Sequence, residues 1–188
     1  MPMPVSFAET EIPDVKEVHV GLHGDPRGFF SETYSRKMWQ QQGFDETFVQ
    51  DNLSLSCKGT LRGLHYQIEP HGMGKLVRAL RGAIFDVAVD LRKGSPTFGK
   101  WVARTLSAEN NLALWVPAGF AHGLLALEDD TLVYYKCTEM HTPKCERALS
   151  YRDPAIGIEW PFEPTEITEK DANAPLLADA EYNFAYEP

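Results

Sequence analysis

Short segments in which apolar and polar side chains alternate dominate this sequence and limit the folds open to it. The clearest segment runs from Gly82 to Arg92 and reads GAIFDVAVDLR. Successive side chains of an extended strand point to opposite faces. One face of this segment would therefore be wholly apolar, and the other would carry Asp86 and Asp90. A period of two residues is typical of a β-strand and not of a helix.

Five further segments have the same strand-like character and are separated by turn-forming residues such as Gly, Pro and Asn. They are Lys75–Arg81, Phe98–Leu106, Leu112–Val116, Leu124–Leu127 and Thr131–Thr138. Many short strands at close spacing are typical of a β-sandwich or barrel. The pattern therefore predicts an all-β fold.

Helical signals are few and lie at the edges of this pattern. Ser35 could cap a short helix that runs through Gln42, with Gly43 as the residue that ends it. After Trp160 the chain is rich in Pro, Glu and Asp. We expect this tail, residues 162–188, to wrap the surface with little regular structure.

Length and charge narrow the class of protein further. A chain of 188 residues is expected to form a single domain, 1–188. Its formal net charge of −9 argues against a nucleic-acid surface. Any anionic ligand must then be held by a local cluster of Arg and Lys. No P-loop or GxGxxG sequence is present, which excludes the usual α/β nucleotide sites.

The cysteines and the apolar segments indicate the compartment. Cys57, Cys137 and Cys145 make an odd number and lack CxxC spacing, which argues against a disulfide framework or a zinc knuckle. The amino-terminal residues lack the basic and apolar regions of a signal peptide. Leu112–Leu127 is interrupted by Pro, Gly and His, so it does not read as a membrane span. We expect a cytoplasmic protein.

Two segments combine histidine with glycine in a way that could build a site. In TLRGLHYQ, Arg62 and His65 flank Gly63, and a glycine within a strand indicates a bulge or a close backbone approach. In WVPAGFAHG, His122 follows a Pro-Gly turn. Taken alone, His65 would be read as a structural residue of the core, and for His122 a structural role and a functional role fit the spacing equally well.

A third segment, LVYYKCTEMHTP, would place Tyr135, Cys137, Glu139 and His141 on one strand face. A positioned tyrosine can act as a general acid. A metal held by the histidines is disfavoured, because compact barrel sites draw two ligands from one short segment. The first segment offers Gln67, a weak ligand, in the place of a second histidine.

Several ordered stretches together resemble a known family, the nucleotide-sugar 3,5-epimerases typified by dTDP-4-dehydrorhamnose 3,5-epimerase. The matching stretches include DPRGFFSE, FVQDNLSLS, GTLRGLHYQ, VPAGFAHG, YYKCTE and TEKDANAPLL, and the long segment from Lys75 to Trp101. They run in order from about residue 20 to residue 177.

The resemblance implies a cupin-type jelly-roll barrel with short peripheral helices. It implies a homodimer that exchanges its N-terminal arm, residues 1–30, and no metal or other cofactor. It also implies an isomerase that inverts C3 and C5 of a nucleotide-linked 4-keto-6-deoxyhexose. The expected reaction converts dTDP-4-dehydro-6-deoxyglucose to dTDP-4-dehydrorhamnose, without a nucleic-acid or membrane partner.

The resemblance also assigns roles to individual residues. His65 matches the general base, Asp171 its partner and Tyr135 the proton donor. Lys75 and Arg62 match groups that polarise the ketone and stabilise an enolate. Asp86 and His122 match further polar residues of the pocket. Positions matched to nucleotide binding, some across the dimer interface, are Arg27, Phe29, Glu32, Gln50, Asn52, Glu146 and Lys170.

One position departs from the family pattern. His141 stands where family members usually carry an aromatic residue, most often tyrosine, which in the thymidine enzymes helps to stack the base. The departure leaves open an epimerase of C3 or C5 alone, or one that uses a GDP- or CDP-linked sugar. A non-catalytic cupin module that binds a sugar nucleotide, and a metal-dependent cupin oxygenase, are further alternatives from other classes.

Overall fold

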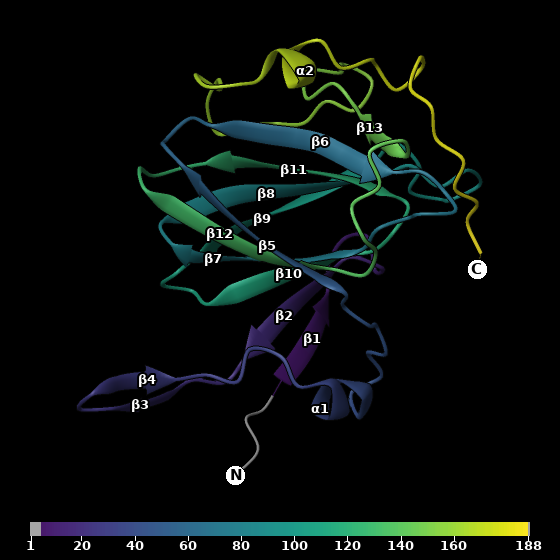
Figure 1. Cartoon of the computed structure of the whole chain (residues 1–188). Coiled ribbons are helices and arrows are strands. Elements are labelled where there is room, and N and C mark those ends of the chain that lie inside the picture. The colour runs from purple at the N-terminus through teal and green to yellow at the C-terminus, as the bar shows by residue number, and fades with distance from the viewer. Residues whose placement is uncertain (1–4, 188) are drawn as a thin grey trace.

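The fold is that of a computed structural model, and residues 5–187 of it are described (Figure 1). Two antiparallel sheets face each other. The six-stranded sheet has the order β1 (Val5–Glu9), β2 (Lys16–Val20), β10 (Leu112–Val116), β7 (Lys75–Arg81), β12 (Thr131–Cys137) and β5 (Gln50–Ser56). The five-stranded sheet has the order β13 (Glu146–Ala148), β6 (Leu61–Gln67), β11 (Phe120–Ala126), β8 (Ala83–Asp90) and β9 (Trp101–Ser107).

Three smaller elements lie outside the two sheets. The hairpin of β3 (His23–Asp25) and β4 (Gly28–Phe30) projects away from the body, at the end remote from the last helix (Figure 1). The helix α1 (Arg36–Gln40) lies beside β1 and β2, and α2 (Glu169–Ala172) lies above β6. The predicted all-β, cupin-type jelly roll with short peripheral helices is confirmed.

The segment with the most regular alternation forms β8, a strand that is buried on both faces. Ile84 and Ala88 join the core between the sheets, where they meet Val77 and Leu114 of the six-stranded sheet. Such a core requires one apolar face from each sheet. Phe85, Val87 and Val89 of β8 pack on the opposite side, in a second apolar cluster.

The carboxyl-terminal part of the chain covers that outer face of the five-stranded sheet. Ile156 and Phe184 are buried there against the apolar residues of β6 and β8. Tyr66 donates a hydrogen bond from its hydroxyl to the Glu181 carbonyl at 2.8 Å. In Figure 1 this yellow segment passes over β6 and includes α2. Its course places α2 next to the strand that carries His65.

The predicted helix is present but shorter than expected. It ends at Gln40, and Ser35 makes no side-chain capping bond. Gly43 does adopt a positive φ of 83° just after the helix, as expected of a residue that ends one.

Two predicted strand starts are corrected. β9 begins at Trp101 and not at Phe98, because residues 95–100 form a turn in which Ser95 and Thr97 donate hydrogen bonds to the Asp90 carboxylate. β11 begins at Phe120 and not at Leu124, directly after Gly119, whose φ is 90°. His122 therefore lies within a strand.

The predicted strand face from Tyr135 to His141 is also wrong in its second half. β12 ends at Cys137, so Glu139 and His141 lie in the following loop. The Gln67 side chain holds this loop: its amide donates to the Met140 carbonyl at 3.2 Å and accepts from the Thr142 amide at 2.6 Å. These bonds draw the chain away from the sheet ladder.

Within residues 5–187 the structure contains no helix that is both long and apolar enough to cross a membrane.

Candidate functional site

The strand β6 approaches β11 unusually closely at Gly63, next to the residues that line the site. Gly63 has a φ of 127°, and a Cβ atom there would lie 2.5 Å from the Cα of Gly123. The pairing with β11 shifts register at this point, so that β6 contains one extra residue between Arg62 and His65. The expected bulge and close approach are confirmed, and only glycine fits such a position without strain.

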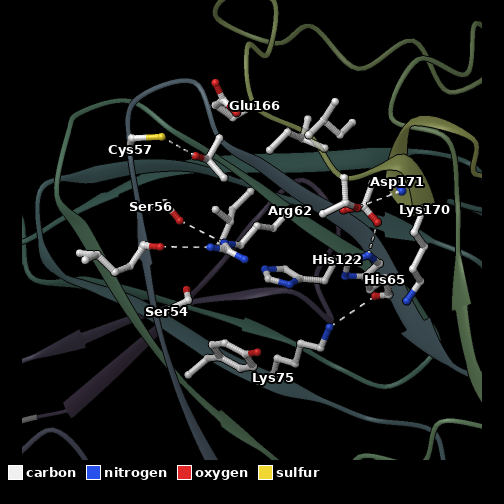
Figure 2. A pocket seen from close by; sticks show the side chains of 17 residues that line it. Ser54, Ser56, Cys57, Arg62, His65, Lys75, His122, Glu166, Lys170 and Asp171 are labelled. Atoms are coloured by element: carbon white, nitrogen blue, oxygen red, sulfur yellow. Dashed lines mark hydrogen bonds and ion pairs between the residues drawn. The ribbon is translucent and has the colours of Figure 1, made fainter.

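His65 and Asp171 form a hydrogen-bonded pair at 2.6 Å, from His65 Nε2 to Asp171 Oδ1 (Figure 2). Asp171 comes from α2, where the Thr168 hydroxyl accepts its backbone N–H at 3.2 Å. The second carboxylate oxygen accepts the Gly63 N–H at 3.4 Å. Burial raises the pKa of Asp171, but the bond to His65 and the other donors lower it more, so its net shift is downward. Asp171 is therefore a buried, ionised partner for the imidazole.

This pair lines a cavity of about 670 Å³ between the two sheets. It is lined by residues expected around the sugar, and also by Lys170, which was matched to nucleotide binding. The former are Arg62, His65, Lys75, His122, Tyr135 and Asp171. A second cavity of about 320 Å³ shares His65, Lys75 and Tyr135, and adds Gln50, Asn52, His141 and Glu146. The three shared side chains thus stand where the two cavities meet.

His65 faces Lys75 and Tyr135 from the opposite sheet, because His65 belongs to β6 whereas the other two come from β7 and β12. The Lys75 ammonium donates to the His65 carbonyl at 3.4 Å. Burial lowers the pKa of Lys75, against the charges of Asp86 and Glu146, which raise it. A cation at this depth is poorly hydrated and can interact strongly with developing negative charge.

Tyr135 is half-buried in the same space. Burial raises the pKa of its hydroxyl, the nearby Cys137 and Glu146 add to this effect, and Arg62 opposes it. The phenol therefore keeps its proton at neutral pH, as a proton donor must.

Arg62 lies at the mouth of the larger cavity and is held by the neighbouring strand β5. Its Nε donates to the Ser56 hydroxyl at 3.0 Å, and a terminal nitrogen donates to the Leu55 carbonyl at 3.1 Å. The remaining guanidinium donors stay available for an anion.

His122 and Asp86 form a second histidine–carboxylate pair, at 2.8 Å. Asp86 is fully buried on β8, directly behind His122, and lines neither cavity. It orients the imidazole of His122, whereas His122 itself reaches the cavity.

The residues matched to nucleotide binding fall into two groups. Gln50, Asn52, His141 and Glu146 line the smaller cavity, and Lys170 lines the larger one. Arg27, Phe29 and Glu32 line neither cavity of their own chain: the first two belong to the β3–β4 hairpin or its turn, and the third follows it (Figure 1).

Sequence reasoning missed two supporting residues. From the sequence Gln67 reads only as a weak metal ligand, whereas in the structure it holds the loop that carries His141. Thr168 caps α2, and the spacing in Thr168–Asp171 is that of a capping box, which could have revealed the helix. Among residues 5–187 no three His, Cys, Asp or Glu side chains gather as a metal ion would require.

Comparison with known proteins shows which family this chain resembles along its whole length. The profile of the family described as dTDP-4-dehydrorhamnose 3,5-epimerase matches residues 9–179. The dTDP-4-dehydrorhamnose 3,5-epimerase of Sinorhizobium fredii is 50% identical over 182 residues, which cover 96% of this chain and 93% of the relative. A dTDP-4-dehydro-6-deoxyglucose 3-epimerase of a Streptomyces species is 40% identical over 163 residues, 85% of this chain and 83% of the relative.

A solved structure has the same fold throughout. It is the crystal structure of dTDP-6-deoxy-D-glucose-3,5-epimerase from Legionella pneumophila Philadelphia 1 in complex with dTDP-4-keto-L-rhamnose. It superposes with a TM-score of 0.94 at 43% identity, and the match covers 98% of this chain and 100% of that one. The fold, the cavity and these relatives lead to one conclusion: this chain belongs to the dTDP-4-dehydrorhamnose 3,5-epimerase family.

Proposed function

We propose that this chain is an isomerase that converts dTDP-4-dehydro-6-deoxyglucose to dTDP-4-dehydrorhamnose by inverting C3 and C5. The observation that carries this proposal is the His65–Asp171 pair, which faces Lys75 and Tyr135 across one cavity. C3 and C5 both lie next to the C4 ketone. One enolate-stabilising group can therefore serve both carbons.

His65 is the base in this proposal. Its Nε2 is bonded to Asp171, which leaves Nδ1 to accept a proton from the carbon next to the ketone. The carboxylate sets the tautomer and stabilises the imidazolium that forms, as in other histidine–carboxylate pairs. The electron pair of the broken C–H bond moves onto the C4 oxygen.

Lys75 and Arg62 stabilise the enolate, and Tyr135 completes the inversion. Both cations line the larger cavity, and such preorganised charge has its greatest effect in a site that excludes water. Tyr135 comes from the opposite sheet to His65, so it can return a proton to the other face of the carbon. His122, held by Asp86, provides a further polar contact for the sugar. The substrate is neither oxidised nor reduced overall in this series of proton transfers, so the reaction needs no redox cofactor.

We also propose that the functional unit is a cytoplasmic homodimer, in which the arm of residues 1–30 reaches the partner. Residues 1–4 of this arm lie outside the described part of the chain. Phe29 and Phe30 are 71% and 66% exposed on the hairpin, and Leu53 of the edge strand β5 is 61% exposed. Exposed apolar side chains on a projecting hairpin and on an edge strand are surfaces that a partner chain could cover. In such a dimer the nucleotide in the partner's cavity would be contacted by Arg27, Phe29 and Glu32. The cytoplasmic location is supported by the free thiols, which suit a reducing compartment: Cys57, Cys137 and Cys145.

The test of the activity is proton NMR in heavy water with dTDP-4-dehydro-6-deoxyglucose as the substrate. Deuterium should enter at both C3 and C5, and dTDP-4-dehydrorhamnose should accumulate. Exchange at C3 alone would identify the activity of the Streptomyces relative instead. Exchange at neither carbon would refute the proposed reaction.

A further inference from the structure

One buried hydroxyl in the wall of the larger cavity is left without a partner by the fold. It belongs to Ser54, on the edge strand β5 (Figure 2). Its Oγ atom is buried and has no hydrogen-bond partner among residues 5–187. Most buried polar atoms in folded proteins are paired, so an unpaired hydroxyl beside a cavity points to a ligand that would pair with it.

The neighbours of Ser54 on β5 show that its lack of a partner is a local exception. Alternate residues of a strand share one face, and on β5 the more buried face carries Asn52, Ser54 and Ser56. The Asn52 amide donates to Cys137 Sγ at 3.3 Å, and the Ser56 hydroxyl accepts from Arg62 Nε at 3.0 Å. Internal bonds therefore occupy the polar groups on either side and leave the Ser54 hydroxyl free.

The row of the sheet that contains Ser54 is otherwise apolar. Ser54 pairs with Val133 of β12, which pairs in turn with Ala79 of β7, and both of these residues are buried. A hydroxyl in such a row costs stability, because it loses its hydrogen bonds to water and gains none from the protein. Packing alone would favour an apolar residue here.

Ser54 lies on the far side of Tyr135 from Lys75. The sheet order β7, β12, β5 places the strand of Tyr135 between the other two. Along β12, Tyr135 pairs with Asn52, while Cys137 pairs with Lys75 in one direction and Ser54 follows in the other. A sugar with its C4 oxygen near Lys75 and a reacting carbon near Tyr135 would therefore extend its next ring carbon toward Ser54.

The chemistry of the proposed substrate identifies the group that meets this hydroxyl. C1 carries the nucleotide and C4 the ketone, while C5 carries a methyl group and the ring oxygen. Hydroxyls remain at C3 and C2. The C3 hydroxyl changes sides during inversion, whereas the C2 hydroxyl keeps its configuration. A fixed side chain can hold only the C2 hydroxyl throughout the reaction, and C2 is the carbon beyond the reacting C3.

We infer that Ser54 binds the C2 hydroxyl of the hexose and so favours a 2-hydroxy sugar over a 2-deoxy sugar. This role rests on the proposed function and deepens it. A serine hydroxyl both donates and accepts, and rotation about χ1 can turn it toward a ligand. Since the contact is the same before and after inversion, its loss should raise KM and leave kcat unchanged.

The experiment is a cycle of two proteins and two ligands. The parent and Ser54→Ala are each titrated in a calorimeter with dTDP-glucose and with dTDP-2-deoxyglucose. We expect the Kd of dTDP-glucose to rise about 5- to 10-fold in the variant, the usual effect of one lost hydrogen bond. The Kd of dTDP-2-deoxyglucose should stay the same. Tm should equal or exceed that of the parent, because the change removes an unpaired polar group.

Cys57→Ala is the matched control. Cys57 lines the same cavity, but its thiol lies 3.3 Å from the Thr60 hydroxyl, so it already has a partner within its own turn. This variant should match the parent with both ligands.

An equal loss of affinity for both ligands in Ser54→Ala would overturn the C2 contact, and so would no loss for either. A parent that binds neither ligand would overturn it as well. The titrations need no turnover, so failure of the proposed reaction and failure of this contact are told apart. If the parent converts the proposed substrate, Ser54→Ala should raise KM by a similar factor, and a lower kcat at unchanged KM would contradict the assigned role.

Discussion

At the scale of single residues, the local environments of Asp171 and Tyr135 set opposite protonation states for these two side chains. Asp171 is only 3% exposed, yet its donors lower its pKa below the ordinary value. The phenol of Tyr135 has a raised pKa in the same cavity, chiefly because it is buried. One group is therefore kept ionised and the other protonated over the whole neutral range. This difference supports Asp171 as the ionised partner of the base His65, and Tyr135 as the proton donor.

Replacing Asp171 by Asn is expected to lower kcat by roughly 10³- to 10⁴-fold, with the fold intact. The amide fills the same space but can stabilise the wrong tautomer of His65, as in other histidine–carboxylate pairs. Rates of epimerisation and circular dichroism of the variant would check this. A loss below about 10-fold, in a folded variant, would contradict an orienting role.

Replacing Tyr135 by Phe should separate the removal of a proton from its return. His65 can still abstract the proton and exchange it with solvent, but the opposite face of the carbon lacks a donor. We expect formation of the inverted product to fall by about 10²- to 10⁴-fold, the usual contribution of a general acid. NMR in heavy water would follow deuterium entering the substrate with its configuration retained. Inversion at the parent rate would remove Tyr135 from the mechanism.

At the scale of elements, β8 shows how a strand buried on both faces ends in an ionic network. Asp90, its last residue, has no exposed surface. Its carboxylate accepts hydrogen bonds from Arg92 at 2.7 Å, Ser95 at 2.6 Å and Thr97 at 2.7 Å. Arg92 also pairs with Asp14 at 3.0 Å. The turn after β8 is thereby joined to the segment that precedes β2.

The variant Asp90→Asn is expected to lower the free energy of unfolding by about 3–5 kcal/mol at pH 7, the typical cost of breaking a buried ion pair. Burial raises the pKa of Asp90, but Arg92 and the hydroxyl donors lower it further, to a net depression. The stabilisation is therefore complete above the unfolded-state pKa of about 3.9 and is lost as pH falls through the lower folded-state pKa. Urea unfolding at a series of pH values would measure both proteins. A difference that stayed constant down to the most acidic pH would contradict this account.

At the scale of the whole molecule, charge and exposed surface are unevenly arranged. The chain carries a net charge of −9, yet Arg62, Lys75 and Lys170 gather around one cavity. Arg27 lies in the turn of a projecting hairpin, outside both cavities of its own chain. A further positive charge from a partner chain would suit the diphosphate of the proposed substrate.

Mixing two impaired variants tests whether the hairpin serves a partner. Arg27→Ala should raise KM, and His65→Asn should be inactive. If the arm is exchanged, a mixed dimer contains one cavity with both His65 and the partner's Arg27. The mixture, after subunit exchange, should therefore be more active than the two variants assayed separately. Light scattering should give the mass of a dimer, and activity no greater than the sum of the variants would refute the exchange.

The parts of the fold that sequence predicted best are those controlled by local side-chain pattern. The alternation in β8, the short helix after Ser35 and the close approach at Gly63 all follow from steric preferences of the residues themselves. The predicted strand boundaries were wrong where side chains from other parts of the sequence form hydrogen bonds with the segment. Hydrogen bonds to Asp90 hold a turn before β9, so this strand starts later than predicted. Hydrogen bonds to Gln67 hold the loop after β12, so the strand face ends before His141.

The sequence by itself determined an all-β chain and the identity of the residues available for chemistry, because alternation and residue type are local properties. Family resemblance also placed His65 and Asp171 in one site. Only the tertiary structure brings these two residues, which are 106 positions apart in the sequence, to a hydrogen-bond distance of 2.6 Å. The close approach of β6 to β11 and the course of the tail over β6 bring the two together. An ion pair of 2.9 Å between Lys170 of α2 and Glu146 of β13 was likewise invisible in sequence, because it depends on the pairing of β13 with β6 and on where α2 lies.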